Sequence, residues 1–296
     1  MNPVVLTFLG VSGPYPGSDD LPSVLLTYGR TNILLDAGEG IQSKLLKVGK
    51  SVTSINAVLI THMHGDHVLG LVPLIQSRSL AGSTTPLYLV GPEGLYEYLI
   101  CSFKNLYFEP GYKTGVFEVS PQAEEGISKE VEIVDLVNAL PTQPAGDTPL
   151  LKFSISKNSL LRLGNDVYVK PFEVKHSITV LAYRIDIKSR LEGRNVSICY
   201  VTDTLPLEET VKECYGVNVL IHDSTFASDL NDKALEYKHS TSIKAAEIAL
   251  KSHAEMLVLY HISPRYKDKL KLLSEARSLF EHTYIVEKYW KLYIKG

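Results

Sequence analysis

The stretch Ala57-Val58-Leu59-Ile60-Thr61-His62-Met63-His64-Gly65-Asp66-His67 decides how the rest of the chain is interpreted. Its apolar first part predicts a short buried strand. The side chains that can bind a metal follow within one glycine-containing loop: His62, His64, Asp66 and His67. Imidazole and carboxylate together suit zinc and similar divalent metals. A single histidine would more often be a neutral packing residue, but three histidines and an aspartate within six positions favour a metal site.

Length and charge limit the possible architectures and partners. The 296 residues, 45% of them apolar, can form one large α/β domain or two modest ones. The formal net charge is −3, from 30 basic and 33 acidic residues, so any site for a polyanion must be local. Basic residues outnumber acidic ones in 151–175 and 265–296, whereas 118–147 is acidic. The two basic stretches are candidates for contact with a polyanion, such as a nucleic-acid backbone, or are solvated charged faces.

The sequence predicts a cytoplasmic protein. Three cysteines, Cys101, Cys199 and Cys214, are an odd number and lie far apart, which favours reduced thiols over a disulfide framework. The N-terminus lacks a basic region followed by a long apolar core, and no run of about eighteen apolar residues occurs in the sequence. We therefore expect neither a secretion signal nor contact with a membrane.

Apolar β-runs alternate with helical patterns, which predicts a single layered α/β domain with mixed sheets over residues 1–296. The expected strands cover 4–9, 23–28, 32–35, 57–60, 87–90, 167–174, 179–187, 197–201, 217–221, 256–260, 284–286 and 289–293. The expected helices cover 41–48, 69–80, 93–104, 243–251 and 266–280. Residues 107–166 interrupt this pattern with prolines and short β-like runs at 131–137 and 150–155. We interpret them as an inserted arm; ordinary edge hairpins and turns are the alternative.

Further polar residues follow strand ends elsewhere in the chain. His176, Asp203, His222 and His261 each lie at or just beyond the C-terminal end of an apolar β-run. Loops at one edge of a sheet are where ligands collect in open α/β architectures. A catalytic zinc needs only about three protein ligands, so about six or seven ligands predict two metal ions.

Segments in four places resemble one known family. They are Asp36-Ala-Gly-Glu-Gly-Ile-Gln42, Ile60 to Leu71, His239-Ser-Thr241 and His261-Ile-Ser-Pro-Arg-Tyr266. In this order they are similar to ribonuclease Z, the endonuclease that trims tRNA 3′ ends, within the metallo-β-lactamase superfamily. The resemblance covers nearly the whole chain. It implies a four-layer αβ/βα sandwich of two mixed sheets with a dimetal site along one edge. The inserted arm inferred from residues 107–166 would precede the third metal-ligand motif.

The resemblance also implies two zinc ions per chain. Their ligands would be His62, His64 and His176 for one ion, Asp66, His67 and His261 for the other, and Asp203 as the bridge. Such ions, about 3.5–4 Å apart, share a hydroxide that attacks the phosphodiester. The same ligands suit Mn²⁺ or Fe²⁺, so the native metal stays open.

Three side chains are implied to take part in catalysis. Asp66 would accept a proton from the nucleophile, and His239 would stabilise the transition state or protonate the leaving group. The family usually has His-Glu-Ala-Thr-Phe where this chain has His222-Asp223-Ser224-Thr225-Phe226. The shorter Asp223 would therefore orient His239 through a different geometry. A polar residue at a helix N-terminus is the alternative for His239, and a packed side chain is the alternative for His222.

The substrate is where the sequence departs from the family. Members that process tRNA usually carry a flexible basic arm between the ligand histidine and the bridging aspartate, but only 26 residues separate His176 from Asp203. The resemblance predicts a homodimeric zinc-dependent endoribonuclease that removes the 3′ trailer of precursor tRNA. A small-molecule phosphodiesterase, for instance one acting on cyclic nucleotides, is the alternative. A flavodiiron-type redox protein is disfavoured because it typically has Glu in place of His64, and a non-enzymatic scaffold because no ligand position is broken.

Overall fold

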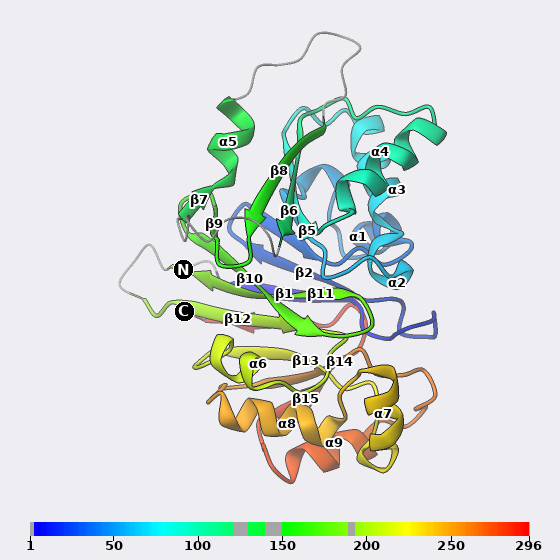
Figure 1. Cartoon of the computed structure of the whole chain (residues 1–296), viewed down its shortest axis with the longest axis vertical. Coiled ribbons are helices and arrows are strands. Elements are labelled where there is room, and N and C mark those ends of the chain that lie inside the picture. Colours follow the sequence, from blue (N-terminus) through cyan, green and yellow to red (C-terminus); the bar gives the residue numbers. More distant parts are fainter. Residues whose placement is uncertain (1–2, 121–129, 140–149, 189–192, 296) are drawn as a thin grey trace.

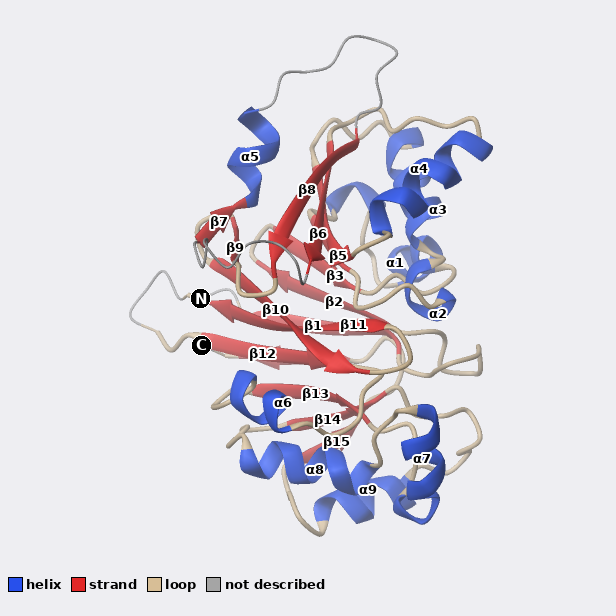
Figure 2. Cartoon of the chain, in the orientation of Figure 1, coloured by secondary structure: helices blue, strands red, loops and turns tan. Residues whose placement is uncertain are grey.

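Two eight-stranded mixed sheets form the centre of the fold in the computed structural model, which describes residues 3–120, 130–139, 150–188 and 193–295. The strand orders are β16-β1-β2-β3-β4-β5-β6-β8 and β15-β14-β13-β12-β11-β10-β9-β7. Helices cover the outer faces of the two sheets (Figure 1), and the layers run helix, sheet, sheet, helix (Figure 2). This arrangement confirms the predicted αβ/βα sandwich.

The first sheet takes most of its strands from the N-terminal half of the chain. Its strands are β1 (Val4–Gly10), β2 (Ser23–Tyr28), β3 (Thr31–Leu35), β4 (Ala57–Leu59), β5 (Leu87–Pro92), β6 (Thr114–Ser120), β8 (Leu150–Ser156) and β16 (Lys291–Ile294). The helices on this side are α1 (Ile41–Lys47), α2 (Gly65–Val68), α3 (Leu71–Leu80) and α4 (Leu95–Asn105), with the 3-10 turn η1 (Val52–Ser54). Strands β3 to β6 and β8 pair in parallel.

The second sheet carries most of the remaining elements. Its strands are β7 (Glu130–Glu132), β9 (Leu160–Leu163), β10 (Val167–Lys175), β11 (Thr179–Ile187), β12 (Val196–Val201), β13 (Val219–Asp223), β14 (Leu257–Tyr260) and β15 (Thr283–Ile285). The helices near it are α5 (Ile133–Ala139), α6 (Glu208–Glu213), α7 (Asn231–Tyr237), α8 (Ser242–Lys251) and α9 (Leu270–Arg277), with the 3-10 turn η2 (Ser228–Leu230). Strands β12 to β15 pair in parallel, and β10 runs in the same direction because it and β12 are both antiparallel to β11.

Burial on both faces explains the continuous apolar run of β4. Ala57 and Leu59 pack into the core between the two sheets, while Val58 and Ile60 pack into the core between the first sheet and its helices. All four residues have 0% exposure. Successive side chains of a strand point to opposite faces, so only an unbroken apolar sequence fits between two layers. Each large apolar side chain buried in this way contributes roughly 1.5–3 kcal/mol, which anchors the loop that follows.

Elements β6, β9, α6 and α7 lie where the sequence predicted no strand or helix, and two predicted segments differ in type or extent. Residues 131–137 were predicted as a β-run, but β7 ends at Glu132 and α5 follows. Ile133 and Val137 are both fully buried, and their spacing of four places them on one face of a helix. The last helix was predicted over 266–280 but covers Leu270–Arg277, and the Asp268 carboxylate accepts the Leu270 N–H just before it.

The predicted arm at 107–166 contributes strands to both sheets. Strands β6 and β8 extend the first sheet, and β7 and β9 form one edge of the second. The proline-containing turns at Pro121 and at 141–146 lie outside the described residues. The interpretation of 107–166 as an insertion stays a prediction. None of the described helices is long and apolar enough to cross a bilayer.

Lys44 on α1 gives the stability a predictable pH dependence. Its side chain is buried and donates a hydrogen bond to the Leu21 carbonyl at 3.1 Å, and burial lowers the pKa of Lys44 from 10.5 to about 8. Between pH 8 and 10.5 the Lys44 side chain keeps its proton in the unfolded chain and has released it in the folded chain. The free energy of unfolding therefore rises with pH in this range. We expect the free energy of unfolding of wild type, relative to Lys44→Met, to increase by about 3 kcal/mol between pH 8 and 10.5.

Urea denaturation of both proteins across this pH range measures the difference. A constant difference would show that the Lys44 ammonium keeps an ordinary pKa in the folded protein.

Candidate metal centre

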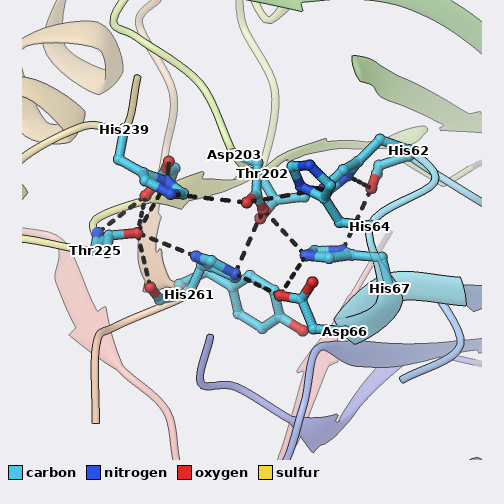
Figure 3. A network of polar contacts seen from close by, with 12 residues as sticks. His62, His64, Asp66, His67, Thr202, Asp203, Thr225, His239 and His261 are labelled. Atoms are coloured by element: carbon cyan, nitrogen blue, oxygen red, sulfur yellow. Dashed lines mark hydrogen bonds and ion pairs between the residues drawn. The ribbon is translucent and has the colours of Figure 1, made fainter. Parts of the chain in front are cut away.

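Polar residues that follow strand ends meet at one edge of the sandwich. His62 lies three residues after β4, His176 directly follows β10, and Asp203 lies two residues after β12. Asp223 ends β13 and His261 directly follows β14. Parallel strands end at a common edge, which is why residues so distant in sequence come together. Figure 3 shows His62, Asp203 and His261 pointing toward one another.

Asp203 lies between two groups of potential ligands. Its Oδ2 is 3.2 Å from His67 Nε2 and 3.5 Å from His261 Nε2. Its Oδ1 faces the other way, 3.9 Å from His62 Nε2 and 4.0 Å from His176 Nε2. Each oxygen therefore faces a different set of nitrogens, as a carboxylate that bridges two metal ions requires.

The spacing within each group fits a metal ion. Asp66 Oδ2 lies 3.3 Å from His67 Nε2 and 3.4 Å from His261 Nε2. On the other side, His62 Nε2 lies 3.0 Å from His64 Nδ1, and with His176 these residues form a group whose ligand atoms lie within 4.8 Å. Ligands about 2.0–2.1 Å from a tetrahedral zinc lie roughly 3.3 Å from one another. The structure thus gathers all the predicted ligands at one place, and the Asp66 group has the spacing of a zinc site.

His67 provides an independent test of this fit. Its Nδ1–H donates to Asp36 Oδ2 at 2.7 Å. Its Nε2 is buried and makes no well-formed hydrogen bond within the described part of the chain, although the oxygens of Asp66 and Asp203 lie close by. Burial alone would lower the pKa of His67, but Asp203 and Asp36 outweigh it and hold this pKa well above its usual value. The space beside Nε2 therefore favours positive charge, which a divalent cation supplies.

The protonation of the other residues also suits metal binding. Burial would raise the pKa of Asp66, but hydrogen bonds from His261 and His67 hold it well below its usual value. The pKa of Asp203 is lowered as well, because the charges of His261, His67 and His62 outweigh burial. Burial and the neighbouring His67 hold the pKa of His62 well below its usual value. Metal ligands have to be deprotonated, and ionised carboxylates beside a neutral imidazole meet this requirement.

Comparison with known proteins identifies the family. The Beta-lactamase superfamily domain matches residues 31–262. Ribonuclease Z of Sulfolobus acidocaldarius is 34% identical, with 95% of this chain and 96% of that protein covered. Ribonuclease Z of Ignicoccus hospitalis is 33% identical, with 96% of each covered. The chain belongs to the ribonuclease Z family of the metallo-β-lactamase superfamily.

Solved structures agree with this assignment to the ribonuclease Z family. The crystal structure of human tRNase Z, short form, superposes with a TM-score of 0.75 at 26% identity, and 97% of this chain and 98% of that chain are covered. The metallo-beta-lactamase fold protein YhfI from Bacillus subtilis superposes with a TM-score of 0.73 at 19% identity and full coverage of both chains. The second likeness concerns the fold alone.

Asp223 reaches His239 despite being shorter than the glutamate usual in the ribonuclease Z family. Its Oδ2 lies 2.8 Å from His239 Nδ1 and also accepts the Thr204 N–H at 3.0 Å. Burial alone would lower the pKa of His239, but Asp223 raises it to about 9. His239 Nε2 points the other way, 4.0 Å from Asp203 Oδ1. An imidazolium held in this way can deliver a proton to a group bound at the metal centre.

The surroundings of His239 and His222 decide between the alternatives stated for each. The N-cap of α8 is Thr241, whose side chain accepts the Lys244 N–H, so His239 does not cap this helix. His222 is fully buried within β13, and its Nδ1 lies 2.9 Å from the Asp223 carbonyl oxygen. It is absent from the residues that line the cleft beside the metal centre. His222 is therefore a packed side chain.

Sequence reasoning gave no role to Asp36, the buried carboxylate behind the metal centre. It directly follows β3 and adopts φ 57°, which turns the chain at the sheet edge. Besides His67, it accepts the Thr61 N–H at 2.7 Å and the Tyr200 hydroxyl at 2.9 Å. Partners of this kind fix the orientation of a ligating imidazole. The signal available in the sequence was a carboxylate at a strand end beside the glycine-rich turn.

A cleft of about 390 Å³ opens onto the metal centre. Asp66, Asp203 and His239 lie along it, together with side chains outside the predicted set: Tyr15, Phe226, Tyr237, Lys238 and Arg265. The Arg265 guanidinium lies 4.9 Å from the centre of the Phe226 ring, and its Nε donates to Ser263 Oγ at 3.0 Å. Cations and aromatic rings beside a metal centre suit a substrate that carries both phosphate and bases.

Proposed function

We propose that this chain is a zinc-dependent endoribonuclease that removes the 3′ trailer of precursor tRNA. The observation that carries the proposal is the complete set of predicted ligands, His62, His64, Asp66, His67, His176, Asp203 and His261, gathered at one sheet edge. Relatives that align over nearly the whole chain are named Ribonuclease Z, which supports RNA as the substrate. We further propose a single domain, since one core of side chains joins both sheets.

The ligands divide into two sets around Asp203. His62, His64 and His176 would hold one ion, and Asp66, His67 and His261 the other. Mn²⁺ or Fe²⁺ fit the same nitrogen and oxygen atoms. When bound, a pair of divalent ions supplies a nucleophile at neutral pH and neutralises charge on the phosphate.

The remaining steps belong to side chains of the protein. The Asp66 carboxylate would accept the proton of the attacking water, since its low pKa leaves it ionised. His239, protonated at neutral pH and oriented by Asp223, would donate a proton to the ribose 3′-oxygen as the bond from phosphorus breaks. Asp223 would thus act on the reaction through His239.

Cleavage of a precursor tRNA that carries a 3′ trailer tests the proposal. We expect a tRNA ending in a 3′-hydroxyl and a trailer beginning with a 5′-phosphate, because the 3′-oxygen is the leaving group. A chromogenic phosphodiester is assayed in parallel. Hydrolysis of the small ester without cleavage of the RNA would contradict the tRNA assignment.

One observation favours a second candidate function. Strand β11 ends at Ile187 and β12 begins at Val196, so the chain between His176 and Asp203 consists of two strands and a short connection. It has no room for the basic arm that tRNA-processing relatives usually carry there. A small-molecule phosphodiesterase, for instance one that hydrolyses cyclic nucleotides, needs no such arm.

Salt dependence separates the two candidates. RNA binding releases counterions, so kcat/KM for precursor tRNA should fall roughly tenfold between 50 and 200 mM salt if about two phosphates are contacted. The small ester should lose less than about twofold over the same range. Initial rates at low substrate concentration measure both, and an RNA rate that is insensitive to salt would contradict an extended RNA contact.

The assembly and compartment follow from the same family resemblance. We propose a homodimer that acts in the cytoplasm on precursor tRNA, without a membrane partner. Light scattering of the purified protein measures the mass directly. A monomeric mass at working concentration would contradict the homodimer.

A further inference from the structure

Two aspartates in different sheets hold a threonine and two histidines in the same pattern of hydrogen bonds. The first set, the Asp36 bracket, consists of Asp36, Thr61, His62 and His67. Asp36 Oδ1 accepts the Thr61 N–H at 2.7 Å and the Thr61 hydroxyl at 3.0 Å, and its Oδ2 lies 2.7 Å from His67 Nδ1. The Thr61 oxygen lies 3.0 Å from His62 Nδ1. The Asp36 bracket therefore orients two proposed metal ligands.

The second set, the Asp223 bracket, consists of Asp223, Thr225, His239 and His261. Asp223 Oδ1 accepts the Thr225 N–H at 2.9 Å and the Thr225 hydroxyl at 2.7 Å, and its Oδ2 lies 2.8 Å from His239 Nδ1. The Thr225 oxygen lies 3.0 Å from His261 Nδ1. These contacts correspond one to one with those of the Asp36 bracket. Figure 3 shows Thr225 between His239 and His261, on the side of these rings away from Asp203.

The protons in the Asp223 bracket can be assigned. A threonine hydroxyl has one proton to donate and two lone pairs. Asp223 Oδ1 and the His261 carbonyl oxygen, which lies 3.0 Å away, can only accept. Whichever of these two oxygens accepts the hydroxyl proton, none is left for Thr225 to donate to His261 Nδ1. His261 Nδ1 must therefore carry its own hydrogen and donate it to the Thr225 oxygen.

This assignment determines what His261 presents to the metal centre. With its hydrogen on Nδ1, His261 carries a lone pair on Nε2. That lone pair faces Asp66 Oδ2 at 3.4 Å and Asp203 Oδ2 at 3.5 Å. A lone pair directed at two carboxylates is favourable only with a cation between them. The same hydroxyl also holds Asp223, which in turn holds His239.

We propose that Thr225 is a positioning residue whose hydroxyl fixes the tautomer of the metal ligand His261 and the orientation of the Asp223–His239 pair. One buried hydroxyl thereby links the metal centre to the proton donor. Thr225 is 2% exposed, so a valine of nearly the same shape leaves little room for a water in place of the hydroxyl. This inference rests on the proposed function of the site as a metal-dependent hydrolase.

Thr225→Val tests the inference because valine has nearly the same shape and lacks the hydroxyl. Loss of a partner of this kind typically costs 10–100-fold in metal affinity or activity. We expect the weaker of two bound zinc ions to dissociate about 10–100-fold more readily, and kcat on precursor tRNA to fall by a similar factor with KM within about threefold. Thr225→Ser, which keeps the hydroxyl, should return both quantities to within about threefold of wild type.

Titration of metal-free protein with Zn²⁺ against a chromophoric chelator measures affinity without any assay of activity. Thr114→Val is the matched control, because the Thr114 hydroxyl is buried and has no hydrogen-bond partner among the residues that the structure describes. This control should keep the zinc affinity and kcat of wild type. If valine at position 225 lowers Tm so far that the metal-free protein unfolds, Thr225→Ala compared with Thr225→Ser gives the same contrast.

Wild-type zinc affinity and kcat in Thr225→Val would overturn the inference. Equal impairment of the valine and serine variants would also overturn it, because the methyl group and not the hydroxyl would then matter. Failure of the wild-type protein to bind zinc or to cleave any phosphodiester would instead contradict the proposed function. The two failures are therefore distinguishable.

Discussion

Asp66→Ala is expected to lower kcat for precursor tRNA by about 10⁴-fold, the upper range for loss of a general base, because the same carboxylate also binds metal. Asp66 Oδ2 lies within 3.4 Å of the Nε2 atoms of both His67 and His261. Its removal takes a ligand from one ion and the proton acceptor from the nucleophile. Single-turnover cleavage of labelled precursor tRNA measures the loss.

The fold should survive this substitution. Asp66 lies on the four-residue helix α2 at the cleft and outside the three apolar cores. The Tm of metal-free Asp66→Ala should therefore lie within a few degrees of wild type. Asp229→Ala is a suitable control, since the Asp229 carboxylate pairs with Lys271 at the surface. Retained cleavage by Asp66→Ala would mean that the site has been misassigned.

His239→Ala is expected to lower kcat for precursor tRNA by about 10³-fold, within the range for loss of a general acid. The ribose 3′-oxygen is a poor leaving group without a proton, and His239 is the imidazolium that Asp223 holds beside the metal centre. His239 is not among the proposed ligands, so the zinc content should stay at the wild-type value.

The choice of leaving group makes this prediction specific. A nitrophenolate leaves without a proton, so His239→Ala should lose less than about tenfold on bis(p-nitrophenyl) phosphate. Asp66→Ala should lose activity on both substrates. Equal losses of His239→Ala on the RNA and the nitrophenyl ester would show that His239 acts on phosphate binding or metal binding and not on the leaving group.

The sequence predicted, for a physical reason, which side chains meet at the edge of the sandwich. His176, Asp203 and His261 each follow an apolar β-run, and parallel strands bring such residues to one edge whatever the lengths of the connections. The unbroken apolar sequence of 57–60 likewise predicted a short buried strand. These features depend on local pattern and on the direction of strands, which a sequence displays.

The parts that the sequence did not predict depend on contacts between distant residues. Asp36 and Thr61 are 25 positions apart, and Tyr200 donates to Asp36 from a separation of 164 positions. No local pattern indicates which hydroxyl will lie behind which imidazole. Helix α5 was missed because its β-branched residues favour a strand. The spacing of Ile133 and Val137 suits a helix equally well, so the local pattern did not decide between the two.

Anomalous diffraction at the zinc edge from zinc-loaded crystals tests the central claim most directly. Two peaks about 3.5–4 Å apart are expected, one bound by His62, His64 and His176 and the other by Asp66, His67 and His261. The Asp203 carboxylate should lie between them. A single peak, or peaks away from these side chains, would contradict the account of a two-metal hydrolytic site.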